Sequence, residues 1–182
     1  MSVPSFSWLR IVLHWLIAIG ILSLFLLGEW MEDLDYYHAW YLRAPEWHRS
    51  LGMLLLALVT LRLGWRLIGP KVPPLPSHRP WEQVLGRLMH ALLDVVTLLV
   101  LVSGYLISTA GGTAVPVFDW FEVPALFNGI ERQESIAGEW HEWLAIALLV
   151  LASLHALAAL KHHFIDRDST LRRMYWPHSR AD

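Results

Sequence analysis

Cysteine is absent from this chain of 182 residues. Without cysteine the chain forms no disulfide, holds no iron–sulfur cluster through thiolates and has no C-x-x-C-H motif for covalent attachment of haem. Charged residues are also scarce, at 16% of the sequence against 55% hydrophobic residues, and the net charge is −2. Charge this sparse and nearly balanced indicates no nucleic-acid partner, and so apolar a composition is typical of a membrane protein.

Four apolar segments are long enough to cross the hydrocarbon core of a bilayer, which takes about 20 helical residues. They are Ile11–Gly28, His48–Gly69, Leu88–Ala110 and Trp140–Lys161. The first is long for the apolar part of a signal peptide, lacks an A-x-A cleavage pattern and precedes the acidic stretch GEWMEDLD, so we expect a retained helix. The sequence thus predicts an all-α fold, an integral membrane four-helix bundle that forms one domain over residues 1–182.

Basic residues gather at alternate connections of this predicted bundle. Eleven of the 14 lie before the first segment, around the connection between the second and third, or after the fourth: Arg10, Arg62, Arg66, Lys71, Arg79, Arg87, Lys161, Arg167, Arg172, Arg173 and Arg180. The other two connections hold three basic and eleven acidic residues, a sum of −8. The positive-inside rule therefore predicts that both termini are cytoplasmic and that the opposite, outer face is acidic.

Histidines lie within or beside these apolar segments, where a polar side chain needs a partner. His141 and His155 are 14 residues apart, close to four helical turns, so both project from nearly one face about 21 Å apart along the axis. Because successive helices alternate in direction, His14 lies near the depth of His155. By the same rule, His48 lies near the depth of His141. Two imidazole pairs at two depths are the axial ligands that two non-covalent b-type haems require, whereas zinc favours four clustered ligands and a proton relay tolerates carboxylates.

Three further residues fall near the predicted inner haem, on the cytoplasmic side. His90 lies at about the depth of His14, and depth does not choose between them as the inner ligand. Asp94, one turn deeper on the same face, fits either a structural pair with His90 or a proton path. Arg62 fits either an ion pair with a haem propionate or snorkelling to the lipid headgroups.

The last segment ends in LKHHF, which contains Lys161, His162 and His163. Together with His90, these side chains can supply hydrogen bonds and protons to a quinone headgroup near the inner haem. A basic anchor at the membrane surface fits the same residues. No role is predicted for the histidines of the loops and tail: His38, His78 and His178.

Four stretches of the chain resemble the bacterial cytochrome b-561 family, which is related to the cytochrome b subunits of nickel–iron hydrogenases and formate dehydrogenases. They are RIVLHWLIA, WHRSLGMLLLALVTLRLGWRL, LGRLMHALLDVV and SLHALAALKHHFIDRDSTLRRM. The resemblance implies a four-helix, di-haem protein of the bacterial inner membrane that exchanges electrons with ubiquinone or another quinone. It also implies that His14 pairs with His155 and His48 with His141, leaving His90 as a pocket residue.

Two functions follow from this resemblance. Some members of the family resemble superoxide oxidases, which pass an electron from superoxide outside to ubiquinone. The rival is a non-enzymatic haem-bearing membrane anchor or electron carrier, serving a separate dehydrogenase or hydrogenase or a periplasmic redox protein. The outer charge of −8 weighs against capture of an anion and better suits a basic protein partner. A plain structural membrane protein does not explain the histidine depths, and the direction of electron flow stays open.

Overall fold

The computed structural model describes residues 6–69 and 72–176, and most of these residues are helical. The elements in order are α1 Trp8–Glu32, α2 Arg43–Ile68, α3 Pro80–Thr109, β1 Val115–Val117, β2 Phe121–Val123, α4 Gln133–Phe164 and the short 3-10 helix η1 Arg172–Met174. Helices α1 to α4 are all long and apolar enough to cross a membrane. The predicted all-α, four-helix membrane bundle is therefore confirmed.

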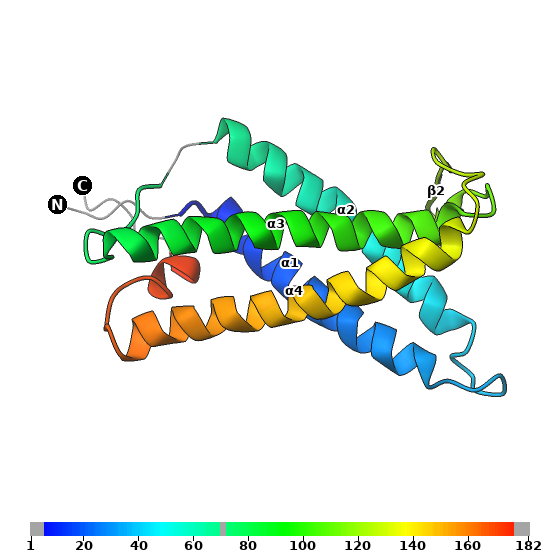
Figure 1. Ribbon diagram of the computed structural model, residues 1–182, viewed down its shortest axis with the longest axis horizontal. Coiled ribbons are helices and arrows are strands. Elements are labelled where there is room, and N and C mark those ends of the chain that lie inside the picture. The colour runs from blue at the N-terminus through cyan, green and yellow to red at the C-terminus, as the bar shows by residue number, and fades with distance from the viewer. Residues whose placement is uncertain (1–5, 70–71, 177–182) are drawn as a thin grey trace.

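Successive helices run in alternating directions (Figure 1). α3 packs along α4, α1 packs along α2, and α2 also contacts α3. The start of α1, the α2–α3 connection and the end of α4 consequently share one end of the bundle, here named the basic end; the α1–α2 and α3–α4 connections form the acidic end (Figure 1). Two of the basic residues counted above, Lys71 and Arg180, lie outside the described residues.

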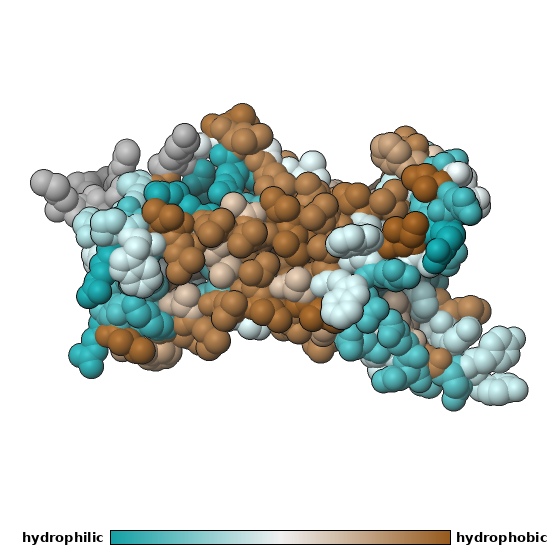
Figure 2. Space-filling view, in the orientation of Figure 1, coloured by the Kyte–Doolittle hydropathy of each residue, from teal (hydrophilic) through white to brown (hydrophobic). Residues whose placement is uncertain are grey.

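Apolar side chains cover the middle of the molecule, on its outside as well as in its core. Figure 2 shows a broad hydrophobic band between two hydrophilic ends. Large side chains in this band are well exposed, including Ile19 at 60% and Leu157 at 61%. A surface of this kind in water would be an aggregation site, whereas lipid tails cover it without cost.

Each helix continues beyond the apolar run that predicts it. α3, for example, starts at Pro80 rather than at Leu88. Proline suits this first position because its missing N–H has no partner within the helix. The Glu82 carboxylate accepts a hydrogen bond of 2.9 Å from the backbone N–H of Arg79 and completes the first turn. Hydropathy detects the part of a helix in lipid, and the polar flanks extend the same hydrogen-bond ladder into the interface.

The α3–α4 connection forms a cap over the acidic end of the bundle. Its two strands pair antiparallel, a hairpin that the hydropathy pattern does not reveal. The fully buried hydroxyl of Ser50 on α2 accepts a hydrogen bond of 2.9 Å from the Phe118 N–H. The Tyr105 hydroxyl on α3 donates to the Pro124 carbonyl and accepts from the Leu126 N–H, both at 2.7 Å. These contacts attach the connection to two helices at once.

Candidate functional site

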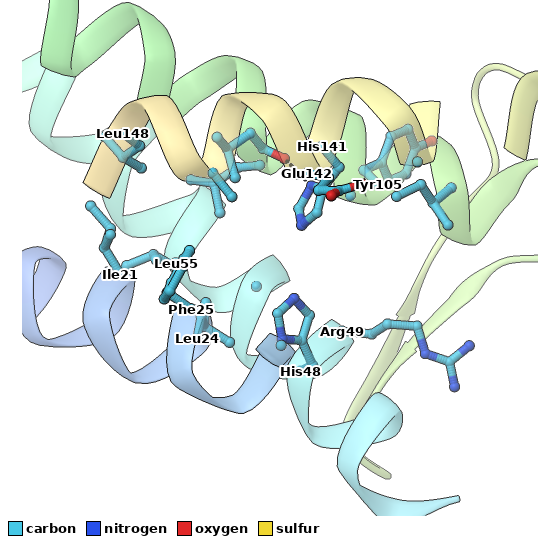
Figure 3. Close-up of a pocket in the computed structure, with 18 of the residues that line it drawn as sticks. Ile21, Leu24, Phe25, His48, Arg49, Leu55, Tyr105, His141, Glu142 and Leu148 are labelled. Carbon is cyan, nitrogen blue, oxygen red and sulfur yellow. Dashed lines mark hydrogen bonds between the residues drawn. The ribbon is translucent and has the colours of Figure 1, made fainter. Parts of the chain in front are cut away.

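Two histidines from different helices face each other across a pocket near the acidic end (Figure 3). His48 of α2 and His141 of α4 have ring centroids 6.1 Å apart, with the ring planes inclined by 75°. The pocket has a volume of about 410 Å³ and a largely apolar lining from all four helices, including Ile21, Leu24, Phe25, Leu55, Leu101 and Leu148. Its size and lining are typical of cofactor sites.

The ring of His141 is held by hydrogen bonds from α3. Its Nδ1 lies 2.9 Å from the carbonyl oxygen of Val100, and since a carbonyl only accepts, Nδ1 carries the proton. The Ser103 hydroxyl oxygen lies 3.1 Å from the same nitrogen. In the neutral imidazole the second nitrogen, Nε2, then carries no proton and is available as a ligand. On the opposite side of the pocket, Nδ1 of His48 is buried and has no hydrogen-bond partner among the described residues.

Glycines make room for both rings. A Cβ on Gly104 of α3 would lie 3.1 Å from Cε1 of His141, and a Cβ on Gly28 of α1 would lie 3.3 Å from Cε1 of His48. Each imidazole thus rests almost directly on the backbone of a neighbouring helix. A Cβ on Gly52, by contrast, would meet no atom within 4 Å in the described part of the chain, because it faces the pocket. Sequence reasoning did not single out Gly28 and Gly104, whose one signal is a glycine within an apolar segment.

Three imidazoles converge near the basic end. The ring centroids of His14 on α1 and His155 on α4 are 6.3 Å apart, and the planes are inclined by 70°. His90 of α3 approaches the same His155 ring more closely, at 5.2 Å. The structure thus brings together all three histidines that the sequence places at one depth. The distances from the His155 ring to its two candidate partners, His14 and His90, differ.

Asp94 forms ion pairs with two arginines of α2. Its Oδ1 lies 3.2 Å from Nη2 of Arg62, and its Oδ2 contacts Nη1 of Arg66. The carboxylate is buried, at 8% exposure. Both carboxylate oxygens of Asp94 thus face guanidinium groups, and the structural pair with His90 stays a prediction. Arg62 reaches this carboxylate, and its contact with a haem propionate or with the lipid headgroups stays a prediction.

The end of α4 takes part in a charged network. Lys161 Nζ lies 3.2 Å from the Glu82 carboxylate of α3 and 2.6 Å from the carboxylate of Asp166. His162 Nδ1 lies 2.8 Å from that same Asp166 oxygen. The next residue, His163, packs its ring on Phe164, with centroids 4.8 Å apart. Of the residues predicted for a quinone site, these three are consecutive at the end of α4, and Lys161 and His162 contact carboxylates.

A loop histidine joins this network. Nε2 of His78 lies 3.1 Å from the Asp168 carboxylate and 3.0 Å from the Thr170 hydroxyl. Burial raises the pKa of Asp168, but the hydrogen bonds from Thr170 and His78 outweigh burial and hold that pKa below its usual range. Sequence reasoning assigned no role to His78, because its partners are 90 and 92 residues away along the chain.

Comparison with known proteins agrees with this arrangement. The family model described as prokaryotic cytochrome b561 matches residues 5–177. The chain is 47% identical over 161 residues to cytochrome b561 homolog 2 of Escherichia coli (strain K12), covering 88% of this chain and 86% of that protein. It is 28% identical over 171 residues to cytochrome b561 homolog 1 of the same strain, with 93% and 96% covered. It is 27% identical over 174 residues to the probable superoxide oxidase CybB of Yersinia pestis, with 93% and 95% covered.

A bundle of four apolar helices with inward histidines and a cofactor-sized pocket defines a membrane protein built to hold a prosthetic group. The chain belongs to the prokaryotic cytochrome b561 family. It is accordingly a multi-pass, electron-transferring membrane cytochrome of the inner membrane that binds b-type haem.

Proposed function

We propose that this cytochrome holds two b-type haems and moves single electrons between the outer face of the inner membrane and the quinone pool. The observation that carries the proposal is the pair of histidine contacts from α4, one to α2 near the acidic end and one to α1 near the basic end. In this proposal the acidic end is outside and the basic end is cytoplasmic, as the positive-inside rule predicts.

The ring separations fit axial ligation. Two imidazoles that bind one iron from opposite sides through bonds of about 2 Å have ring centroids roughly 6 Å apart. The His48–His141 and His14–His155 separations are 6.1 and 6.3 Å. The His90–His155 separation of 5.2 Å is too short for an iron between the rings. These distances support His14 as the inner ligand and His90 as a pocket residue.

The bound haems supply the one-electron chemistry, and the chain supplies ligation, orientation and charge. The Val100 carbonyl fixes the tautomer and the ring plane of His141. Near the inner pair, the Asp94 carboxylate offsets part of the positive charge of Arg62 and Arg66.

In this proposal, quinone is reduced at the basic end of the bundle. A quinone needs hydrogen-bond donors for its carbonyl oxygens and protons after reduction. Arg62, His90, Lys161, His162 and His163 supply both within one end of the bundle. The contacts of Lys161 and His162 with Glu82 and Asp166 support a route for protons from the cytoplasm.

The outer redox partner is proposed to be a basic protein. The acidic end carries a charge of −8, which attracts a cationic surface and repels a small anion. Superoxide is the second candidate, because one relative at 27% identity bears the name probable superoxide oxidase.

The test uses the purified protein in detergent. We expect two b-type haems per chain by pyridine haemochrome assay and anaerobic reduction of both by a short-chain ubiquinol. Electron exchange with a basic soluble cytochrome c should slow markedly as salt rises from about 0.01 to 0.15 M, because screening shortens the reach of the outer charge. One haem per chain, or no reaction with quinol, would refute the proposal. If electron exchange with cytochrome c does not depend on salt and superoxide rapidly drives quinone reduction, the outer partner is superoxide and not a basic protein.

Replacing His90 by alanine should leave two haems per chain, since its ring lies too close to His155 to share an iron with it. Haem per chain from the absorbance spectrum checks this. If the H90A protein holds a single haem while H14A holds two, helix α3 supplies the inner ligand and the assignment of His14 is wrong.

Adding one methyl group at Gly104 should weaken the outer haem specifically. The new Cβ would lie 3.1 Å from the His141 ring, which must tilt away from its hydrogen bond with Val100. Overpacking of this kind costs about 1–3 kcal/mol, or roughly five- to 150-fold faster haem loss. Transfer of haem from the G104A protein to excess apomyoglobin measures it. Gly86→Ala, on the same helix, is the matched control, because its Cβ would meet no described atom within 4 Å; equal rates in both variants would contradict the close contact.

A further inference from the structure

Two parts of the chain that are distant in the sequence meet beyond the basic end of the membrane band: the loop before α3, and the end of α4 with the turn that follows it. The loop before α3 contributes His78, the last turn of α4 contributes His162, and the turn that follows α4 contributes Asp168. Their three potential ligand atoms all lie within 4.8 Å of one another. Two imidazoles and one carboxylate are a donor set that proteins use for zinc.

The Asp168 carboxylate is the centre of this group. Its Oδ2 lies 3.1 Å from Nε2 of His78 and 3.2 Å from Nδ1 of His162. In a tetrahedral zinc site with bonds of about 2.0–2.1 Å, neighbouring ligand atoms lie roughly 3.3 Å apart. The two imidazoles therefore stand at the spacing from one oxygen that a shared ion requires.

His162 gives a second, independent observation. Its Nδ1 is buried and makes no hydrogen bond of acceptable geometry to any described residue, although two carboxylate oxygens lie within 3.2 Å. The rings of His78 and His162 lie 4.6 Å apart, inclined by 35°, and each has a nitrogen within 3.2 Å of Oδ2 of Asp168. An ion bound among these atoms would give this nitrogen a coordination bond, which its two carboxylate contacts do not replace with a hydrogen bond.

The surroundings hold the carboxylate in place. The backbone N–H of Thr170 donates a hydrogen bond of 2.8 Å to Oδ1 of Asp168, which leaves Oδ2 for the imidazoles. Glu82 and Asp166 also lie near His162, but Lys161 Nζ contacts both carboxylates and repels a cation there. The ion therefore belongs on the side of His78.

We propose that His78, His162 and Asp168 form a binding site for one divalent cation of the zinc class, with a fourth position for water. The ion ties the loop before α3 to the end of α4 and to the turn after it. This inference does not depend on the proposed quinone chemistry, because its readout is bound metal.

The test uses the haem-loaded, full-length protein after removal of the purification tag and treatment with a chelator. Zinc is titrated against a chromophoric indicator, and bound metal is counted by mass spectrometry after gel filtration. We expect one tightly bound zinc per chain. His78→Ala and Asp168→Asn should each weaken zinc binding at least tenfold, with unchanged haem per chain showing that the fold is intact.

The matched control is His163→Ala, which removes the neighbouring histidine of the same helix end and should bind zinc as the unchanged protein does. Asp168→Asn keeps the shape of the side chain and its hydrogen bond from the Thr170 N–H. If His78→Ala loses haem, the zinc affinity of D168N therefore tests the site. Substoichiometric zinc in the unchanged protein, or equal zinc affinity in D168N, would show that the three residues form only an ion-paired cluster and would overturn the proposal.

Discussion

Substituting His141 by alanine should leave one b-type haem per chain, and substituting His48 should give the same one-haem spectrum. In the proposed arrangement, each variant removes one of the two axial ligands of the outer haem and leaves the inner pair, about 21 Å away along α4, unchanged. His155→Ala and His14→Ala should give a second, different one-haem spectrum. Pyridine haemochrome assay and low-temperature reduced spectra measure both quantities.

Redox titration of the four variants identifies which haem remains. The acidic end favours oxidised iron, whereas Arg62 and Arg66 lie near the inner pair, so the haem that survives in the H141A protein should have the higher potential. The proposed ligand pairs are wrong if H141A and H155A give identical spectra. They are also wrong if H141A loses both haems while H48A keeps both, or if H155A loses both while H14A keeps both.

Neutralising Asp94 should be the most destabilising change outside the haem ligands. Asp94→Asn leaves Arg62 and Arg66 facing each other beside the buried position of the carboxylate. Loss of one partner of a fully buried pair costs about 3–5 kcal/mol, and we expect less here, about 2–3 kcal/mol, because the side chains of Arg62 and Arg66 are 29% and 50% exposed. For a chain of this size, that lowers Tm by about 4–12 °C.

Thermal unfolding in detergent, followed by loss of the haem absorbance band, checks this value. Asp119→Asn is the control, an exposed aspartate of the capping connection, and should change stability by less than about 0.5 kcal/mol. In the double variant Asp94→Asn, Arg66→Ala, part of the loss should be recovered because one unpaired charge is removed. An unchanged Tm in D94N would show that lipid headgroups or water compensate the arginines fully.

Much of the candidate site was predictable because it depends on distances along single helices. The spacing of His141 and His155 follows from the helical rise, and alternation of helix direction brings His14 and His48 to the matching depths. The ring contacts of the structure agree with those depths. The same logic could not choose between His14 and His90, since both have the same depth and differ only in how their helices are rotated.

The sequence by itself determined what is local or one-dimensional: four spans, the depth of each histidine and the segregation of charge, all of which follow from helical rise and bilayer thickness. Only the tertiary structure decided which side chains meet across helices. It turned Asp94 toward the arginines of α2, laid His141 on Gly104 and brought His78 to Asp168 from 90 residues away. These contacts depend on helix rotation and on the course of the connections, which result from the packing of all four helices together.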